Sequence, residues 1–276
     1  MKPVIDMAWL MEHRGEVAVA DVRWYLDGRS GRAAYEAGHI PGAVFIDLEM
    51  WLAGEGSPDV GRHPLPAPET FARGMSLNGI SDTSTVVAYD DAGGVIAARL
   101  VWMLRSTGHE GALLDGGLGA YDGTLETHSP EPALGVFTAR PWPEERLVTI
   151  EEVTKRGAIL IDARTRDRFR GDSDPIDPRA GHIPGAHSIP CRENLRDNGT
   201  FLPADEIRRK FEAIGVVSAD STISYCGSGV TACHNLLALE MCGLGEGRLF
   251  PGSWSQYANA ARLPVATGDP EPLSGP

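Results

Sequence analysis

The sequence predicts an α/β protein built from two copies of one unit, each a mainly parallel sheet flanked by helices. The first observation is a repeated heptapeptide, AGHIPGA, at residues 37–43 and again at residues 180–186. The second is an apolar strand pattern that ends in Asp-x-Arg upstream of each copy, at residues 17–23 and 158–164. The third is the alternation of short apolar strands with helical patterns, which is typical of parallel sheets covered by helices.

The repeat continues downstream in both halves. Residues 86–89 match residues 222–225 as a short buried strand, and LDGGLGAY at 114–121 matches FPGSWSQY at 250–257. Each half is therefore expected to run strand, helix, strand, strand, helix, strand.

These matches place a first domain at residues 1–124, a linker at 125–147 and a second domain at 148–276. The linker has four prolines and no sustained hydrophobic period, so we expect it to be extended and packed along the domains. A chain of 276 residues is long enough for two domains that each bury a core.

The composition excludes several partners. A net charge of −13 and a pI near 5.0 argue against binding to nucleic acid or to an anionic membrane surface. The sequence lacks an apolar run of the roughly 18 residues that a membrane span needs, and its amino end does not resemble a signal peptide. A cytoplasmic protein is expected.

All four cysteines, Cys191, Cys226, Cys233 and Cys242, lie in the C-terminal half. Their spacing fits neither a CxxC pair nor a secreted disulfide framework. The neighbouring Cys233 and His234 lack partners at the spacing of metal ligands, so no metal site is predicted.

Cys226 follows the strand predicted at residues 222–225 and precedes a helix predicted at residues 232–242. The loop between them can turn its backbone N–H groups toward the sulfur and favour the thiolate. These N–H groups belong to Gly227, Ser228, Gly229, Val230 and Thr231. Cys226 is therefore a predicted nucleophile, and the alternative is a small core residue beside glycines that merely turn the chain.

The repeat also separates residues of the fold from residues of the site. The residues that both halves keep are expected to serve the fold, and they are Asp21 and Asp162, Arg23 and Arg164, and His39 and His182. The cysteine loop occurs once, and the first half has Asp90 or Asp91 at the corresponding place. Because a carboxylate cannot accept sulfur as a thiolate does, the first domain is predicted to be catalytically silent.

An arginine-rich run at residues 164–179 follows the second Asp-x-Arg strand. If a helix starts here, residues four apart share a face, which groups Arg164 with Arg168 and Arg166 with Arg170. One face is expected to bind an anion, because a guanidinium grips a carboxylate with two parallel hydrogen bonds. The alternative for Arg166 and Arg170 is a solvated surface paired with nearby aspartates.

The CGSGVT loop after a strand resembles the active-site loop of the rhodanese-type sulfurtransferases, and the two repeats resemble tandem rhodanese domains over nearly the whole chain. The uncharged loop resembles that of the family's 3-mercaptopyruvate enzymes more than that of its thiosulfate enzymes. The resemblance implies transfer of sulfur from 3-mercaptopyruvate to a thioredoxin-like thiol, a low-molecular-weight thiol or cyanide, through a persulfide on Cys226. It implies no metal and no organic cofactor.

Other functions compete with this interpretation. One is thiosulfate:cyanide sulfurtransfer, and another is a noncatalytic tandem binding module, which predicts no reactive thiol. A cysteine phosphatase would need an arginine six residues after the nucleophile, where this chain has Ala232.

The resemblance also implies roles for single residues. Arg168 in the RFRG motif is expected to bind the substrate, and Arg179 is expected to do the same from a motif that matches less closely. Ser228 is expected to relay a proton, and His39 is expected to lie near the substrate.

Overall fold

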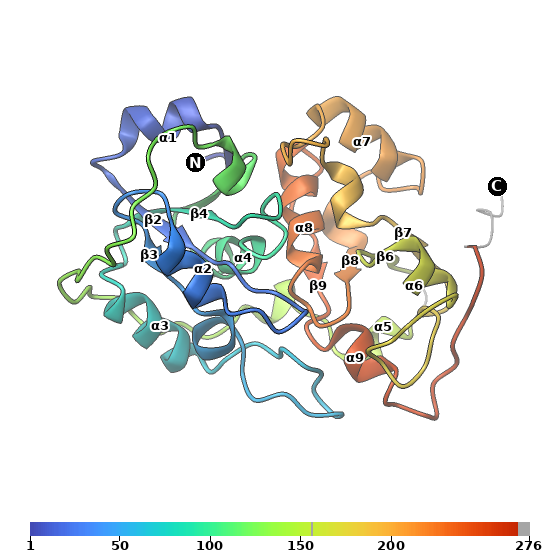
Figure 1. Cartoon of the computed structure of the whole chain (residues 1–276). Helices are drawn as coiled ribbons and strands as arrows, with labels where there is room; N and C mark the ends of the chain where they lie inside the picture. The colour runs from blue at the N-terminus through green and yellow to red at the C-terminus, as the bar shows by residue number, and fades with distance from the viewer. Residues whose placement is uncertain (156, 270–276) are drawn as a thin grey trace. The chain divides into compact units, whose positions relative to one another are not determined.

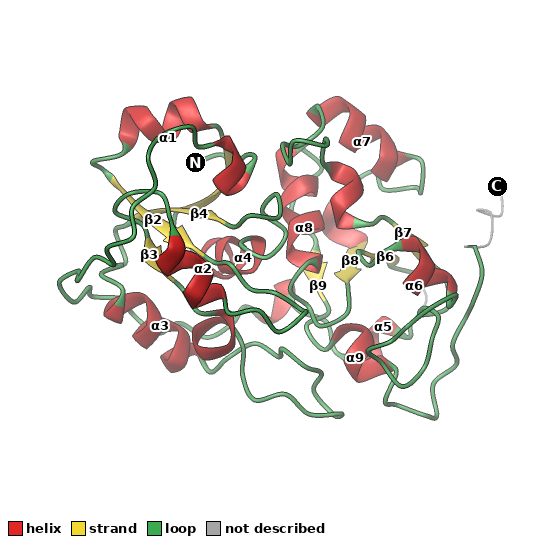
Figure 2. Cartoon of the chain, viewed as in Figure 1, coloured by secondary structure: helices red, strands yellow, loops and turns green. Residues whose placement is uncertain are grey.

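The computed structural model describes residues 1–155 and 157–269, and it contains two parallel sheets with helices around them (Figures 1 and 2). The predicted fold class is therefore confirmed. The last seven residues of the second predicted domain, 270–276, lie outside the described residues. In the described part of the chain, every helix is too short or too polar to cross a membrane.

The chain folds into two compact units. Unit 1 comprises residues 1–54, 65–143 and 195–201, and unit 2 comprises residues 55–64, 144–194 and those from 202 onward. Two segments thus belong to the unit opposite to their place in the sequence, and the boundaries predicted at residues 124 and 148 do not include this exchange. Residues 55–64 and 195–201 are equivalent in the repeat, because each ends directly before a Leu-Pro-Ala motif, at residues 65–67 and 202–204.

The sheet of unit 1 has the strand order β1-β5-β4-β2-β3, and all neighbouring strands are parallel. The strands are β1 (Val4–Ile5), β2 (Val17–Asp21), β3 (Val44–Phe45), β4 (Thr85–Tyr89) and β5 (Gly111–Leu114). Strands β2 and β4 pair over their full length, so that Asp21 stands opposite Tyr89 at the carboxyl edge of the sheet.

Helices lie on both sides of these strands in the view of Figure 2. They are α1 (Met7–His13), α2 (Gly31–Ala37), α3 (Pro68–Leu77) and α4 (Ala98–Ser106). Asp6 and Ser30 start the first two as N-caps, since each side chain accepts a hydrogen bond from a first-turn N–H group. Helix α3 begins at Pro68 and was not predicted, because the repeat pattern indicated two successive strands there.

The sheet of unit 2 has the strand order β7-β6-β8-β9 and is also parallel throughout. The strands are β6 (Ile159–Asp162), β7 (Ala186–Ser188), β8 (Thr222–Tyr225) and β9 (Arg248–Leu249). Asp162 pairs with Tyr225, so β6 and β8 end together at the carboxyl edge. In open parallel sheets this edge is where ligands bind.

The helices of unit 2 include one that is mostly apolar and largely buried. They are α5 (Ile150–Val153), α6 (Arg166–Arg170), α7 (Ala204–Glu212), α8 (Ala232–Met241) and α9 (Ser253–Tyr257). Helix α8 is buried over its first eight residues, which makes it a core helix. The predicted strand at residues 222–225 is confirmed as β8, and the predicted helix is confirmed as α8, with Cys242 as its C-cap.

The Asp-x-Arg pairs serve the fold in both units, as the repeat predicted. Arg23 Nη2 donates to Asp21 Oδ2 at 2.7 Å, and Arg164 Nη2 donates to Asp162 Oδ2 at 2.6 Å. The same Nη2 atoms also donate to the glycine carbonyl before the repeated histidine, at 2.8 and 2.7 Å. Each buried pair therefore ties the edge of the sheet to the AGHIPGA turn.

Candidate active site

Cys226 stands directly after β8, at the carboxyl edge of the unit 2 sheet. It is buried, and the Gly229 N–H donates to Cys226 Sγ at 3.1 Å. An N–H group directed at sulfur stabilises a thiolate, because it places a partial positive charge beside the negative atom.

The first turn of α9 gives the loop its shape. The N–H groups of Trp254 and Ser255 donate to the carbonyls of Cys226 and Gly227, both at 2.9 Å. The Cys226 N–H donates to Ser253 Oγ at 3.1 Å. Because α9 takes up these carbonyls, the loop can present N–H groups on its inner side.

Two residues adopt unusual backbone conformations to allow this arrangement. Ser253 has a φ of 51°, a conformation that costs a non-glycine residue about 1–3 kcal/mol. Gly229 has a φ of 79°, and a Cβ atom built there would lie 2.5 Å from the Pro251 carbonyl oxygen. Glycine is therefore required at position 229 by conformation and by space.

Ser228 forms a hydrogen bond with a histidine that the sequence did not single out. Its Oγ atom lies 2.7 Å from His63 Nδ1, and His63 is buried. His63 belongs to unit 2 through the 55–64 segment. A hydroxyl and an imidazole at this distance can exchange a proton, which supports the expected relay role of Ser228.

The other three cysteines differ from Cys226 in their surroundings. Burial, together with the charge of Cys226, raises the pKa of the Cys191 thiol to about 12. Burial also raises the pKa of the Cys242 thiol. The Cys233 thiol donates to the Gly229 carbonyl at 3.4 Å and so packs behind the loop. Neutral thiols are poor nucleophiles, which leaves Cys226 as the candidate.

Arg168 lies on α6 beside the loop. Its Nη2 atom donates to Asp177 Oδ2 at 2.9 Å and to Asp174 Oδ1 at 3.1 Å. Its Nη1 atom would lie 3.4 Å from a Cβ atom built on Gly227. The structure therefore brings Arg168 next to the residue that follows the candidate nucleophile.

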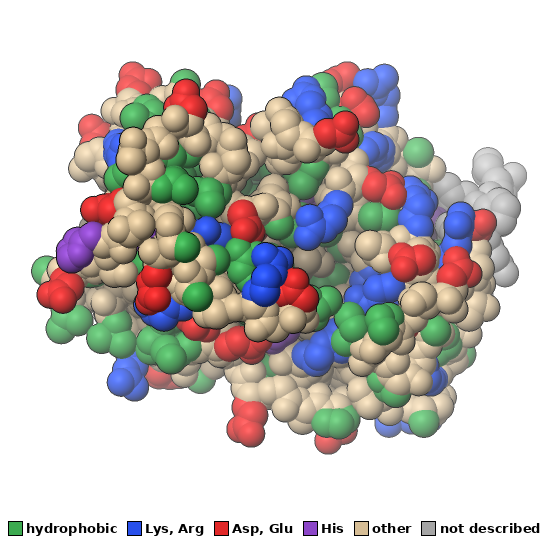
Figure 3. All heavy atoms as spheres, viewed as in Figure 1, with side chains coloured by type: hydrophobic (Ala, Val, Ile, Leu, Met, Phe, Trp, Pro, Cys, Tyr) green, Lys and Arg blue, Asp and Glu red, His purple; other side chains and the backbone are tan. Residues whose placement is uncertain are grey.

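The two faces of α6 divide as the spacing predicted. Arg166 and Arg170 point to the surface, where they pair with the exposed carboxylates of Glu193 and Asp269. Glu193 and Asp269 lie 27 and 99 residues along the chain from their arginines, so they are not the nearby aspartates expected from the sequence. Figure 3 shows such basic and acidic side chains interspersed on the face in view. Exposed pairs of this kind contribute little to stability and are not part of the site.

The structure gives Arg179 a different role from the predicted substrate contact. Its guanidinium donates four hydrogen bonds, at 2.7 to 2.9 Å, to backbone carbonyls in and after α9. Arg179 thus caps the C-terminal end of α9, where cations are favoured. Four of its five N–H donors are thus engaged within the described part of the protein, and one Nη1 N–H remains for another acceptor.

The expected substrate contact of His39 also finds no support. His39 is fully buried in unit 1, with Nδ1 2.8 Å from the Tyr35 carbonyl and its ring stacked on Tyr35 at 3.9 Å. His182 repeats this arrangement on Phe169 in unit 2, with 2.8 Å and 3.7 Å for the same contacts. The shared geometry indicates a packing role for both histidines.

Sequence reasoning missed Arg62, His63 and Asp177. A signal for the first two was present, because GRHPLP at residues 61–66 corresponds to NGTFLP at residues 198–203 in the other copy. His63 therefore stands opposite Thr200, a difference between the copies like that at Cys226. The segment was missed because it was assigned to the wrong domain.

A cavity of about 490 Å³ opens beside these residues. Its lining consists of Gly56, Ser57, Pro58, Arg62, His63, Ile176, Asp177, Pro178, Ser255 and Asn259. All of them belong to unit 2. The cavity gives a small polar ligand a path toward the Ser228 and Arg168 side of the loop.

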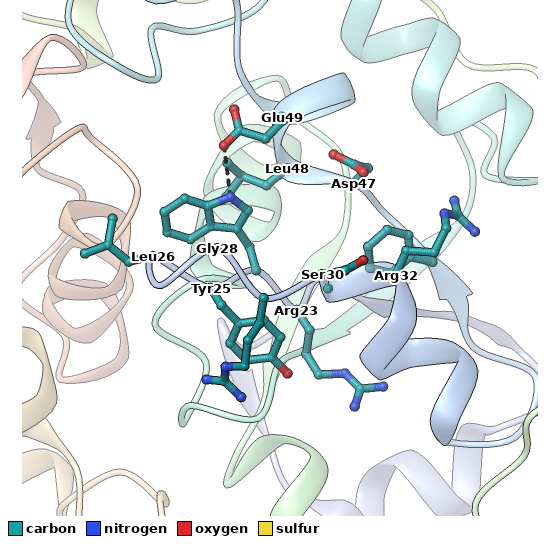
Figure 4. Close-up of a pocket in the computed structure, with 13 residues that line it drawn as sticks. Arg23, Tyr25, Leu26, Gly28, Ser30, Arg32, Asp47, Leu48 and Glu49 are labelled. Carbon is teal, nitrogen blue, oxygen red and sulfur yellow. Dashed lines mark hydrogen bonds between the residues drawn. The ribbon is translucent and has the colours of Figure 1, made fainter.

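A second pocket, of about 390 Å³, lies at the ends of β2 and β3 in unit 1 (Figure 4). Trp24 Nε1 donates to Glu49 Oε1 at 2.9 Å there, and Arg23 is bound to Asp21. Its lining contains no cysteine, so it offers no counterpart of Cys226. Within residues 1–155 and 157–269, His, Cys, Asp and Glu side chains do not gather in any group that could hold a metal ion.

Comparison with known proteins gives consistent results. The rhodanese-like domain family matches residues 6–124 and 149–260. The chain is similar to a probable 3-mercaptopyruvate sulfurtransferase of Pseudomonas aeruginosa, with 42% identity over 92% of this chain and 93% of that one. It is also similar to a putative thiosulfate sulfurtransferase of Mycobacterium tuberculosis, with 38% identity over 95% of each chain.

The fold is also similar to a solved structure. The 3-mercaptopyruvate sulfurtransferase of Escherichia coli superposes with a TM-score of 0.80 and 35% sequence identity. The match covers 92% of this chain and 99% of the Escherichia coli chain.

Proposed function

Because this chain belongs to the rhodanese family of sulfurtransferases, we propose that it transfers sulfur from 3-mercaptopyruvate to a thiol or cyanide through a persulfide on Cys226. The observation that carries the proposal is the Cys226 sulfur at the end of β8, which accepts the Gly229 N–H inside a loop fixed by α9. Thiol acceptors would be thioredoxin-like proteins or low-molecular-weight thiols.

In the first step the Cys226 thiolate attacks the sulfur of mercaptopyruvate. The new S–S bond forms as the C–S bond breaks, and the electron pair of that bond stays on carbon as the pyruvate enolate. The proton of the donor's thiol ends on the methyl carbon of pyruvate. The products are therefore pyruvate and a negatively charged persulfide on Cys226, which the loop N–H groups stabilise.

Ser228 and His63 are suited to move this proton. The Ser228 hydroxyl stands two residues after Cys226, and His63 Nδ1 lies 2.7 Å from its oxygen. A hydroxyl hydrogen-bonded to an imidazole can accept the proton of the donor's thiol, whose sulfur is transferred to Cys226, and deliver it to the carbon of the departing enolate. The two residues thus act as an acid–base relay that involves no cofactor.

In the second step an acceptor attacks the outer sulfur of the persulfide. The S–S bond breaks and its electron pair returns to Cys226 as the thiolate. Cyanide leaves as thiocyanate, and a thiol acceptor leaves as a persulfide.

Thiosulfate is the second candidate donor, and the similarity to a putative thiosulfate sulfurtransferase favours it. Its attack by Cys226 would release sulfite, which retains two negative charges near the loop. Gly227 and Ser228 supply no cationic side chain there, and the nearby arginines are partly neutralised by Asp174 and Asp177. We therefore favour mercaptopyruvate, since its monoanionic carboxylate needs less positive charge.

Two measurements test the proposal. The value of kcat/KM for 3-mercaptopyruvate is expected to exceed that for thiosulfate with the same cyanide acceptor. Intact-mass analysis after incubation with 3-mercaptopyruvate alone is expected to show one added sulfur atom, which Cys226→Ser abolishes. A preference for thiosulfate would favour the second candidate, and an absence of added sulfur from either donor would favour a noncatalytic binding module.

A further inference from the structure

Two arginines from distant parts of the sequence converge on Gly227. A Cβ atom built on Gly227 would lie 3.0 Å from Arg62 Nη2 and 3.4 Å from Arg168 Nη1. Arg62 comes from the 55–64 segment and Arg168 comes from α6, and both belong to unit 2. Two guanidinium groups therefore face the same point beside the residue that follows Cys226.

Asp177 holds both arginines in this position. Its Oδ1 atom accepts a hydrogen bond from Arg62 Nη1, and its Oδ2 atom accepts one from Arg168 Nη2. The Asp177 carboxylate is only 1% exposed. The Arg62 backbone N–H also donates to Ser255 Oγ at 3.0 Å, which fixes the segment. A single buried carboxylate thus sets the separation of the two guanidinium groups.

In each arginine, the terminal nitrogen that does not contact Asp177 is free to bind a ligand. Within residues 1–155 and 157–269, Arg62 Nη2 and Arg168 Nη1 make no hydrogen bond to protein. The Nε atoms of both arginines are buried without a partner in the same part of the chain. The Nη atoms beside Gly227 are therefore the donors that a ligand could reach, because they lack an acceptor within the described part of the protein.

The charges around this point favour a particular kind of ligand. Arg62 and Arg168 are balanced by Asp174 and Asp177, so the group has no large net positive charge. Such a site binds ligands through directed hydrogen bonds more than through long-range electrostatic attraction. A planar carboxylate suits two convergent guanidinium groups, because its two oxygens can each accept from one of them.

We propose that Arg62 binds the carboxylate of the sulfur donor together with Arg168, and that Asp177 is the positioning residue for both. The inference rests on the proposed function, since it assigns the carboxylate of that donor. Only two carbon atoms separate the sulfur of mercaptopyruvate from its carboxylate carbon. A carboxylate beside Gly227 therefore leaves the sulfur beside Cys226. Arg62 takes the role that the sequence assigned to Arg179.

Steady-state kinetics with 3-mercaptopyruvate test this assignment on wild type, Arg62→Gln and Arg62→Lys. Arg62→Gln is expected to lower kcat/KM by about 10- to 100-fold, mainly through KM, because a charge-assisted contact is lost. Arg62→Lys should recover part of this loss, since it restores the charge without the planar fork. Arg166→Gln is the matched control, because its guanidinium lies on the exposed face of α6 and should leave kcat/KM unchanged.

The second half-reaction separates substrate binding from a general structural effect. Transfer from the preloaded Cys226 persulfide to cyanide should proceed at the wild-type rate in Arg62→Gln, because cyanide has no carboxylate. Asp177→Asn should show the same split, with a loss of about 10-fold confined to the donor step. Equal losses in both half-reactions, or no loss relative to Arg166→Gln, would overturn the assignment.

Pyruvate binding distinguishes this inference from the proposed function. Pyruvate carries the same carboxylate as the donor, and its Kd can be measured by calorimetry without turnover. Arg62→Gln is expected to weaken pyruvate binding about 10-fold or more. If Arg62→Gln weakens pyruvate binding but the wild-type protein does not turn over mercaptopyruvate, the result would contradict the proposed function alone. Normal turnover with unchanged pyruvate binding would contradict the role of Arg62 alone.

Discussion

The loops after β4 and β8 occupy equivalent places in the two units but surround different side chains. In unit 2 the loop surrounds the Cys226 sulfur, which accepts the N–H of Gly229. In unit 1 the corresponding residue is Asp90, which is fully buried. Both loops follow a strand that ends in a tyrosine, and the hydroxyl of Tyr89 or Tyr225 accepts the N–H of the isoleucine in its own AGHIPGA turn.

Both oxygen atoms of the Asp90 carboxylate accept hydrogen bonds from the backbone of its own loop. Its Oδ1 atom accepts N–H groups at 2.7 and 2.8 Å, and its Oδ2 atom accepts two more at 2.7 and 2.9 Å. The donors are Ala92, Gly94, Ile96 and Ala97. Backbone N–H groups thus face the side chain in both copies: four donate to the Asp90 carboxylate, and that of Gly229 donates to the Cys226 sulfur. Burial raises the pKa of the Asp90 carboxyl group, while its four backbone hydrogen bonds favour the ionised form. Asp90 thus serves the fold, whereas a cysteine sulfur at this place can accept a transferred sulfur atom.

The largest expected effect concerns the nucleophile. Cys226→Ser should abolish thiocyanate formation from 3-mercaptopyruvate and cyanide, because serine cannot form a persulfide. Adding Asp90→Cys to this variant should not restore activity, since Asp91 and Ala92 follow in place of a serine bonded to histidine. Recovery of turnover in the double variant would show that the first loop is silent only because it lacks a thiol.

The next effect concerns the relay proposed for Ser228 and His63 in unit 2. His63→Asn and Ser228→Ala should each lower kcat with mercaptopyruvate by about 100-fold, the usual contribution of a positioned acid–base group. The double variant should lose little more than either single variant, because the two residues act through one hydrogen bond. Fully additive losses would separate the two residues into independent roles.

The third effect is on stability, and here the unit 1 loop is expected to be more sensitive to substitution than the Cys226 loop. Asp90→Asn should lower the free energy of unfolding by about 2–3 kcal/mol, because an amide NH₂ would face two backbone donors. Cys226→Ser should change it by less than about 1 kcal/mol. Urea denaturation measures both values, with Glu36→Gln as a control at an exposed, weakly paired carboxylate. Equal changes in unfolding free energy at positions 90 and 226 would argue against a stabilising role of the Asp90 carboxylate in unit 1.

The smallest expected difference, about 1–2 kcal/mol between two glycine variants, separates conformation from space in the Cys226 loop. Gly229→Ala should cost about 1 kcal/mol for its positive φ and a further about 1–2 kcal/mol for the contact with the Pro251 carbonyl. Gly185→Ala is the matched control, because Gly185 has a φ of 83° but open space around it. If the two variants unfold at the same urea concentration, the Pro251 contact is relieved by a small shift and the loop is less tightly held than the structure indicates.

The elements that the sequence predicted best are those that it repeats. Two AGHIPGA turns, two Asp-x-Arg strands and one cysteine loop were enough to predict the fold class and to locate Cys226 at a strand end. The same comparison assigned Asp21 and Asp162 to structural pairs, which the structure confirms.

The residues that were predicted poorly depend on contacts between distant segments. Arg179 and Arg62 carry the same guanidinium group, so the residue type does not distinguish their roles. Their surroundings do, because Arg179 donates to backbone carbonyls at the end of α9 and Arg62 lies beside Gly227. His63 lies 165 residues before Ser228, and no local pattern indicates that its chain segment folds with the second copy. Spacing along a sequence identifies neighbours on one helix or strand, but it does not identify partners across such an exchange.

The exchange of residues 55–64 bears on how this gene could have evolved after its duplication. A protein cut between the two repeats would keep Cys226 and Arg168 but lose His63 and Arg62, which the earlier repeat encodes. Deleting the first copy would therefore remove two residues of the proposed site in the second copy, even though the first copy has Asp90 where the second has Cys226. Once the duplicates shared residues in this way, selection on activity alone would suffice to retain both.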